Sequence, residues 1–298
     1  MPRCSWQGSS TGRTGTGRRP STDLRYLFKD RPYEEGTALP DYDTLYIASS
    51  GSELYGKILW PDGSFSRPRP CVVLLHGFPG SCRNDDLSHA LCRTGCVVLT
   101  PHHRGAWGSE GKYLVSNCVE DAVNIALHVR SEAFLRKYNV DPDLIFLGGH
   151  SMGSCSVLNA SKALSWLRGL LLIAPFDPWQ LLKEGDEEKL KALLGEGEVL
   201  HHDGKDVLYN DLKSHALEYS FPNAYESVKD QNLFFALGSL DKVAPPEKMT
   251  GELRERLEKH STKAVQRFKS YPAGHGLLGC RCAFIEDAAR FIYDSSNL

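Results

Sequence analysis

Short apolar runs recur along this chain, and most are separated by stretches with a helical pattern. Continuous apolar runs of four to eight residues are typical of strands buried on both faces of a parallel sheet. We expect strands of the sheet at Cys71–Leu75, Cys96–Thr100, Leu144–Leu147, Leu170–Ala174, Leu233–Leu237 and, as the last, Val265–Tyr271. Near the start, Thr44–Ile47 and Leu54–Leu59 flank a Gly-Ser turn and predict an opening hairpin.

Helical patterns fill the spaces between these strands. Apolar residues at i, i+3, i+4, i+7 and i+8 predict an amphipathic helix, with Val119, Ala122, Val123, Ala126 and Leu127 on its buried side. We expect further helices at Asp86–Arg93 and Glu247–His260, and a closing helix that buries Ile285, Ala288, Ala289 and Ile292. Alternating strands and helices predict an α/β fold with a mostly parallel central sheet flanked by helices.

The alternation is broken between Pro178 and Asp230 by a charged segment that is far longer than a normal connection. We interpret residues 178–230 as an inserted cap, because ligands of such sheets bind beyond the carboxyl ends of the strands, where this segment emerges. A surface decoration unrelated to activity is the alternative. Within the insertion we expect a helix at Leu181–Leu194 and a small hairpin at Val199–Tyr209. The remaining divisions are a tail, 1–22, predicted to be disordered from its composition, and a core formed by 23–177 and 231–298.

Composition excludes several classes of function. With 298 residues, 41% of them apolar, the chain can build a full core. A formal charge of −2 gives no reason to expect nucleic acid as a partner. No apolar run approaches the roughly 20 residues that span a bilayer, and no apolar segment typical of a secretion signal follows the basic N-terminus.

The cysteines indicate a reducing compartment. Their number, nine, is odd, and they are scattered through the predicted strands and helices, as expected of free thiols in a cytoplasmic protein. Cys280 and Cys282 are too close in sequence for a typical zinc pair, so we expect no metal. The glycines do not form a nucleotide-binding fingerprint, and we expect no cofactor.

The pentapeptide Gly149-His150-Ser151-Met152-Gly153 directly follows a predicted buried strand and precedes a helix-compatible stretch. A sharp strand-to-helix turn exposes a serine hydroxyl above the sheet, and flanking glycines permit that turn. A second match, Gly8-Ser9-Ser10-Thr11-Gly12, lies in the tail with neither strand nor helix beside it. We therefore predict Ser151 as a nucleophile.

A serine nucleophile needs a base and an acid to orient that base. His275 follows the last predicted strand between two glycines, and a neutral imidazole accepts a hydroxyl proton near neutral pH. Asp241 follows the strand before it and completes the chain order Ser, Asp, His. Asp177, after an earlier strand, is the alternative acid.

An oxyanion hole requires two backbone N–H groups near the attacked carbonyl. Met152, next to the nucleophile, is one predicted donor, and Phe78 in the loop His76-Gly77-Phe78-Pro79-Gly80 is the other. His76 and Trp107 are candidate pocket residues; Trp107 lies in a loop after a strand that is equally consistent with a purely structural role.

Taken in order, these motifs resemble the α/β-hydrolase superfamily over roughly residues 40–295. Val140-Asp141-Pro142-Asp143 resembles the dienelactone-hydrolase and prolyl-oligopeptidase branches, and the position of the cap is similar to that of feruloyl (cinnamoyl) esterases. Many relatives have a glycine where this chain has Ser154; a small residue still fits close packing of helix against strand.

The resemblance implies a serine hydrolase that cleaves a small or aromatic acyl ester through an acyl-enzyme, without a cofactor. Two alternatives stay open. One is a peptidase or aminopeptidase of the prolyl-oligopeptidase type, although the chain is too short to include that family's propeller. The other is an inactive hydrolase fold that binds a ligand or partner. The acyl and alcohol groups and the oligomeric state are not readable from these motifs.

Overall fold

The structure is a computed structural model that describes residues 22–65, 67–81 and 84–297. Nearly all of the predicted tail, including the Gly8–Gly12 pentapeptide, lies outside the described residues.

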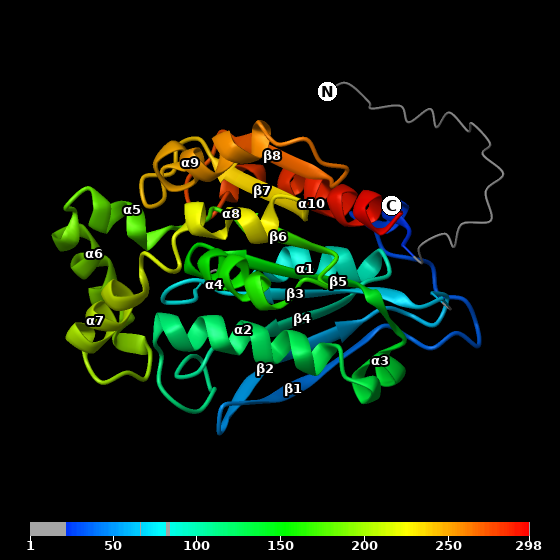
Figure 1. The fold of residues 1–298 in the computed structure, drawn as a ribbon. Coiled ribbons are helices and arrows are strands. Elements are labelled where there is room, and N and C mark those ends of the chain that lie inside the picture. Colours follow the sequence, from blue (N-terminus) through cyan, green and yellow to red (C-terminus); the bar gives the residue numbers. More distant parts are fainter. Residues whose placement is uncertain (1–21, 66, 82–83, 298) are drawn as a thin grey trace.

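An eight-stranded sheet forms the centre of the described chain (Figure 1). Its order is β1-β2-β4-β3-β5-β6-β7-β8. The first two strands form the expected antiparallel hairpin, β2 pairs antiparallel with β4, and the other neighbours are parallel, so the predicted fold class is confirmed. The strands are β1 (Asp41–Ser49), β2 (Ser52–Trp60), β3 (Arg69–Leu75), β4 (Val97–Pro101), β5 (Val140–His150), β6 (Gly169–Ile173), β7 (Asn232–Gly238) and β8 (Gln266–Tyr271).

Helices cover both faces of the sheet (Figure 1). One face is covered by η1 (Leu24–Tyr26), α1 (Asp85–Arg93) and α10 (Arg281–Ser296), preceded by η5 (Leu278–Cys280). The other face is covered by α2 (Val115–Val129), α3 (Glu132–Tyr138), α4 (Met152–Ala160), η2 (Ser161–Ala163), η4 (Phe221–Ala224), α8 (Tyr225–Val228) and α9 (Pro246–Glu258).

Two apolar cores result from this layering. Successive side chains of a strand point to opposite faces, so Leu170 and Leu172 of β6 join one core while Leu171 and Ile173 join the other. All four are inaccessible to solvent. Truncating any of these leucines to alanine should cost about 2–5 kcal/mol of stability.

The buried face of α2 differs from the predicted one. Leu127, expected on the apolar side, is 52% exposed, whereas Cys118, Asp121 and Ile125 are buried. The helix is rotated because its buried carboxylate, Asp121, accepts hydrogen bonds from Ser49 Oγ and from Arg104 N and Nε. The predicted stripe counted apolar residues alone and missed this polar anchor.

The insertion between β6 and β7 contains α5 (Pro178–Lys183), α6 (Glu187–Leu194), η3 (Gly195–Val199) and α7 (Lys205–His215), before η4 and α8 lead into β7. Its first helices lie beyond the strand ends (Figure 1). The hairpin expected at Val199–Tyr209 is wrong: Gly204, read as its turn, precedes α7 as the N-cap with φ 108°.

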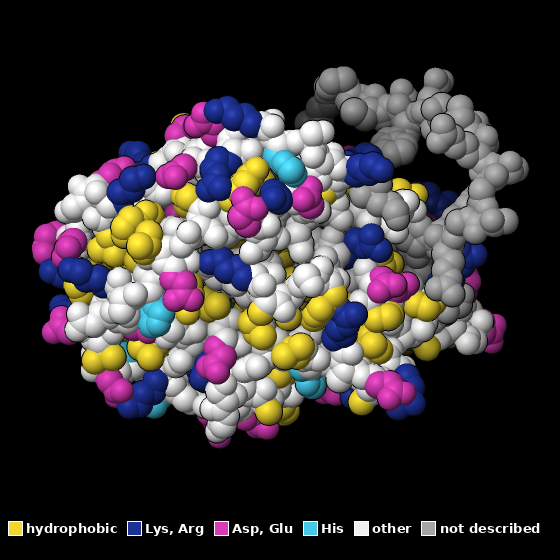
Figure 2. Space-filling view, in the orientation of Figure 1, with side chains coloured by type: hydrophobic (Ala, Val, Ile, Leu, Met, Phe, Trp, Pro, Cys, Tyr) yellow, Lys and Arg dark blue, Asp and Glu magenta, His cyan; other side chains and the backbone are white. Residues whose placement is uncertain are grey.

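Acidic and basic side chains are interspersed on the face seen in Figure 2. This mixture agrees with the near-neutral formal charge of −2. Among the described residues, no helix combines the length and the apolar composition needed to cross a bilayer. The cytoplasmic location stays a prediction.

Candidate active site

Ser151 lies at the turn between β5 and α4 with φ 56° and ψ −120°. A non-glycine residue rarely adopts a positive φ, and such strain persists only where the surroundings hold it. Here the backbone N–H of Ser151 donates to the carbonyl of Ile173 on β6 (2.9 Å), and its own carbonyl accepts from Ser154 N (2.9 Å). The sheet and the first turn of the helix therefore fix the serine.

Three glycines let the backbone close around this turn. A Cβ on Gly149 would lie 2.2 Å from the carbonyl carbon of Gly153, and one on Gly153 would lie 2.6 Å from the carbonyl oxygen of His76. A Cβ on Gly77 would lie 2.8 Å from Cβ of Ser151 and 3.4 Å from the Met152 nitrogen. The His76–Gly80 loop thus lies directly against the nucleophile turn, as the prediction of an oxyanion hole requires.

Ser154 links the nucleophile helix to two strands. Its buried Oγ donates to the carbonyl of Gly149 on β5 (2.6 Å) and accepts from Ile173 N on β6 (3.1 Å). Ser154, at a position where the resemblance led us to expect glycine, therefore contributes hydrogen bonds of its own.

Asp241 and His275 are brought together from the loops after β7 and β8. Asp241 Oδ2 accepts from Nδ1 of His275 (2.7 Å), while Oδ1 accepts from the backbone N–H groups of Val243 and Ala244 (both 2.9 Å). Burial alone would raise the pKa of Asp241, but the hydrogen bonds from His275, Ala244 and Val243 outweigh it and lower that pKa. An ionised carboxylate thus holds Nδ1 protonated and leaves Nε2 as the basic nitrogen.

His150 supports the His275 loop from beneath. Its Nε2 donates to the carbonyl of His275 (3.0 Å), and the two rings lie 4.8 Å apart between centroids. Burial, followed by the nearby His275 ring, lowers the pKa of His150 to about 4, so this imidazole is neutral at pH 7. The sequence motif contained His150, but only this contact assigns it a positioning role.

Asp177, the alternative acid, lies elsewhere. Its carboxylate caps α5 through Trp179 N (3.0 Å) and accepts from Phe221 N (3.0 Å) at the far end of the insertion. Burial raises the pKa of Asp177 to about 7. This aspartate joins the two ends of the insertion, and its hydrogen bonds do not include His275.

Several of the predicted site residues line one cavity of about 280 Å³. Ser151 and His275 line it, together with both predicted oxyanion donors, Phe78 and Met152. Such a volume suits a small acyl group rather than a large ligand. The prediction did not include the cavity residues Leu193 and Glu196, which come from the insertion.

The two candidate pocket residues lie behind this cavity and are not among its described lining residues. His76 is 3% exposed; its Nε2 accepts from His103 N (3.2 Å), so Nδ1 carries the proton and donates to the Gly77 carbonyl (2.8 Å). Trp107 donates its indole N–H to the carbonyl of Pro79 (2.9 Å). Both side chains therefore brace the loop that carries Phe78.

Several polar links hold the insertion beside the site. His201 N donates to the Gly105 carbonyl (2.7 Å), and Tyr113 N donates to the His201 carbonyl (2.8 Å). Asp211 of α7 accepts from the hydroxyl of Ser116 on α2 (2.5 Å). These links join the insertion to the loop after β4 and to the helix that follows it.

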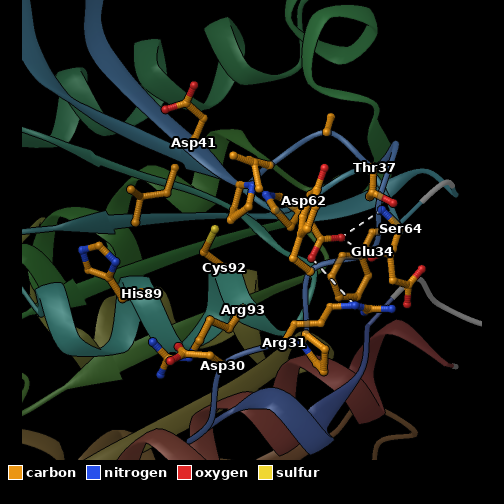
Figure 3. Close-up of a pocket in the computed structure, with 18 of the residues that line it drawn as sticks. Asp30, Arg31, Glu34, Thr37, Asp41, Asp62, Ser64, His89, Cys92 and Arg93 are labelled. Atoms are coloured by element: carbon orange, nitrogen blue, oxygen red, sulfur yellow. Dashed lines mark hydrogen bonds and ion pairs between the residues drawn. The ribbon is translucent and has the colours of Figure 1, made fainter.

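A second, larger cavity of about 490 Å³ lies between residues 30–42, the end of β2 and α1 (Figure 3). Two of its charged groups form an ion pair: Arg31 Nε lies 3.8 Å from Asp62, which also accepts a hydrogen bond from Ser64 N (2.9 Å). Burial raises the pKa of its cysteine, Cys92, to about 12, so that thiol is no nucleophile at pH 7. Within the described part of the chain, no cluster of histidine, cysteine or acidic residues is arranged to hold a metal.

Comparison with known proteins agrees with this geometry. Residues 66–196 match the model of the family described as Serine aminopeptidase, S33. Monoglyceride lipase of Mus musculus is 32% identical over 133 residues, which are 43% of this chain but only 41% of the lipase. The family match includes the His76 loop and Ser151 but ends before Asp241 and His275, so it does not test the acid and base.

Solved structures of esterases superpose over most of the chain. Est1E from Butyrivibrio proteoclasticus covers 85% of it (98% of Est1E; 14% identity, TM-score 0.61), and brefeldin A esterase, a bacterial homologue of human hormone sensitive lipase, covers 91% (82% of that chain; 16% identity, TM-score 0.61). DcsB, solved with its substrate analogue, covers 87% (all of DcsB; 14% identity, TM-score 0.63).

The layered sheet with its positive-φ turn at Ser151 is therefore the α/β-hydrolase fold. The described chain has this fold, as its motifs predicted, and residues 66–196 match a serine-hydrolase family model.

Proposed function

We propose that this protein is a serine hydrolase that cleaves carboxylic esters. One observation carries the proposal: the hydrogen-bonded pair of Asp241 and His275 (2.7 Å) lies at the cavity into which the nucleophile turn presents Ser151. Esterases among the structural relatives support an ester as the substrate. The cavity of about 280 Å³ supports a small acyl group.

The reaction is a two-step acyl transfer. Ser151 Oγ attacks the ester carbonyl while His275 Nε2 takes the hydroxyl proton, and the N–H groups of Phe78 and Met152 stabilise the negative oxygen that forms. The C–O bond to the alcohol then breaks, and the alcohol leaves with the proton from His275. Water, deprotonated by the same imidazole, attacks the acyl-enzyme, which releases the acid and returns the proton to Ser151.

In the same proposal, residues 178–230 act as a cap. Leu193 and Glu196 contribute to the cavity wall, and Gly197 packs against the Phe78 ring so closely that a Cβ there would lie 2.5 Å from Cζ. The cap therefore shapes the volume that an acyl or alcohol group can occupy, while the chemistry stays with the strand ends.

The experiment compares 4-nitrophenyl acetate, butyrate and octanoate as substrates for the wild type and Ser151→Ala. We expect hydrolysis by the wild type and a loss of at least about 10³-fold in kcat in the variant. Ser10→Ala, which removes the serine of the second Gly-x-Ser-x-Gly match, is the matched control and should keep full activity. Equal rates in wild type and Ser151→Ala would overturn the proposal.

An aminopeptidase is the second candidate, favoured by the description of the matching family. Aminoacyl 4-nitroanilides assayed beside the esters distinguish the two. The ester proposal fails if the amides are cleaved with comparable kcat/KM. A fluorophosphonate probe tests the inactive-fold alternative: labelling of the wild type but not of Ser151→Ala excludes it.

A further inference from the structure

Glu196 introduces a negative charge into a cavity wall that is otherwise uncharged or made of histidine. Among the described residues, no lysine, arginine or other acid lines this cavity. Glu196 is exposed and forms no ion pair within the described part of the chain. Its carboxylate is therefore available to a group that enters the cavity.

The turn that carries Glu196 is held against the proposed oxyanion loop. Gly197 is buried against the Phe78 ring, which leaves no room for a side chain there. Immediately beyond η3, Leu200 N donates to the Gly197 carbonyl (2.8 Å), and the His201 bridge to Gly105 follows. The backbone that carries Glu196 is therefore held at the cavity that Ser151 also lines.

We propose that Glu196 is a specificity residue, which favours esters with a cationic group at the cavity mouth and disfavours esters with an anionic one. The inference rests on the proposed ester hydrolysis and adds the charge class of the substrate. A carboxylate attracts a cation within several ångströms, and partly screened surroundings reduce the interaction without abolishing it. Sulfonate or carboxylate groups are repelled to a similar degree.

The expected selectivity is moderate. For charges about 7 Å apart in surroundings of effective dielectric about 40–80, the attraction corresponds to about three- to sevenfold in kcat/KM. We expect the wild type to favour the cationic over the neutral ester by that factor. Raising the salt concentration to about 0.5 M should reduce the preference, because the Debye length falls well below this separation.

The test uses two matched series of esters followed by titration of the released acid. In the first, the charge lies in the alcohol: butyrylcholine, its neutral isostere 3,3-dimethylbutyl butyrate and anionic 2-sulfoethyl butyrate. In the second, it lies in the acyl group of ethyl esters: 4-(trimethylammonio)butanoate, neutral 5,5-dimethylhexanoate and anionic 4-sulfobutanoate. The ratio of charged to neutral kcat/KM, taken within each variant, is the readout.

In the series whose charged group lies at the cavity mouth, Glu196→Gln should bring the cationic-to-neutral and the anionic-to-neutral ratio of kcat/KM close to one. Glu198→Gln is the matched control, because it removes an exposed carboxylate from the same η3 turn but not from the cavity wall. The control should retain the wild-type ratios. Unchanged ratios for Glu196→Gln in both series would overturn the inference while leaving the ester proposal intact. Failure of the wild type to cleave even the neutral esters would instead contradict the proposed function.

Discussion

The strand ends that carry the candidate site and the insertion beside them are held in place by different means. Ser151 is fixed by sheet hydrogen bonds and by glycines whose neighbours lie less than 3 Å from where a Cβ would be. The insertion packs on an apolar cluster that it shares with core residues such as Tyr113, Met152 and Met249, and polar links such as the His201 bridge add to this packing. We expect changes at the strand ends to reduce turnover of every ester, and changes at the insertion to alter which ester is accepted.

The largest expected effect separates the two candidate acids. Asp241→Asn removes the charge that orients His275, so kcat for 4-nitrophenyl butyrate should fall by about 10³- to 10⁴-fold. Asp177→Asn, a matched change of a buried aspartate at the base of the insertion, should lower kcat less than about tenfold. Comparable losses in the two variants would show that the acid had been assigned wrongly.

A smaller effect concerns stability against pH. The folded pKa of Asp177, about 7, lies above its unfolded value of 3.8, so its contribution to stability is fully present below pH 3.8 and is lost as pH rises to 7. The loss amounts to about 4 kcal/mol. Asparagine does not titrate, so Asp177→Asn does not lose this stability. The unfolding free energy of the variant minus that of the wild type should therefore rise by about 4 kcal/mol between pH 4 and pH 7.

Titration of His150 changes the folding stability with pH in the direction opposite to that of Asp177. Its folded pKa, about 4, lies below 6.5, so stability falls by about 3 kcal/mol as pH drops from 6.5 to 4. The two contributions nearly cancel in the wild type, and Asp177→Asn should therefore expose a stability that increases with pH. Urea unfolding at several pH values measures both slopes. Parallel curves for variant and wild type would contradict the role given to Asp177.

The His201 bridge, formed by its backbone hydrogen bonds to Gly105 and Tyr113, allows a test of whether the insertion controls which ester is accepted. A Cβ on Gly105 would lie 2.3 Å from Tyr113 N and 2.5 Å from the His201 carbonyl oxygen, so Gly105→Ala must displace the bridge. We expect kcat/KM for 4-nitrophenyl octanoate to change by about tenfold and that for acetate by much less. Gly36→Ala is the matched control: its φ of 82° resembles the 70° of Gly105, but no atom lies within 4 Å of its added Cβ. Equal changes in kcat/KM for the two esters would contradict the expectation that the insertion alters which ester is accepted.

The smallest expected effect is at the exposed ion pair of Lys112 and Asp203, which also joins the insertion to the core. Both side chains are about half exposed (48% and 53%). Lys112→Ala should reduce the unfolding free energy by at most about 0.5 kcal/mol, because solvent and salt screen such pairs. A loss above about 1 kcal/mol would indicate that this link, rather than the buried bridge, holds the insertion.

Much of the core could be predicted because its signals are local. Continuous apolar runs marked the buried strands, and Gly-x-Ser-x-Gly after one of them located the positive-φ turn at Ser151. The order of Asp241 and His275 after later strands placed them at one sheet edge, since carboxyl ends of parallel strands meet there.

What could not be predicted depends on contacts distant in sequence. The rotation of α2 follows from Asp121 pairing with Arg104, which no apolar count detects. At Gly204 the local signal was ambiguous, because a positive-φ glycine serves a hairpin turn and a helix N-cap alike. Nothing in the sequence distinguishes Glu196 from the other charged residues of the insertion, and only the fold places it at the cavity.

Ser154 also limits how freely parts can be exchanged among relatives. Its hydroxyl bonds a carbonyl of β5 and an amide of β6, so Ser154→Gly would remove both of these buried hydrogen bonds. A chimera that takes β5 and α4 from another protein would therefore need β6 from the same protein. Strands β5 and β6 and helix α4 would therefore have to be exchanged together, with Ser154 retained.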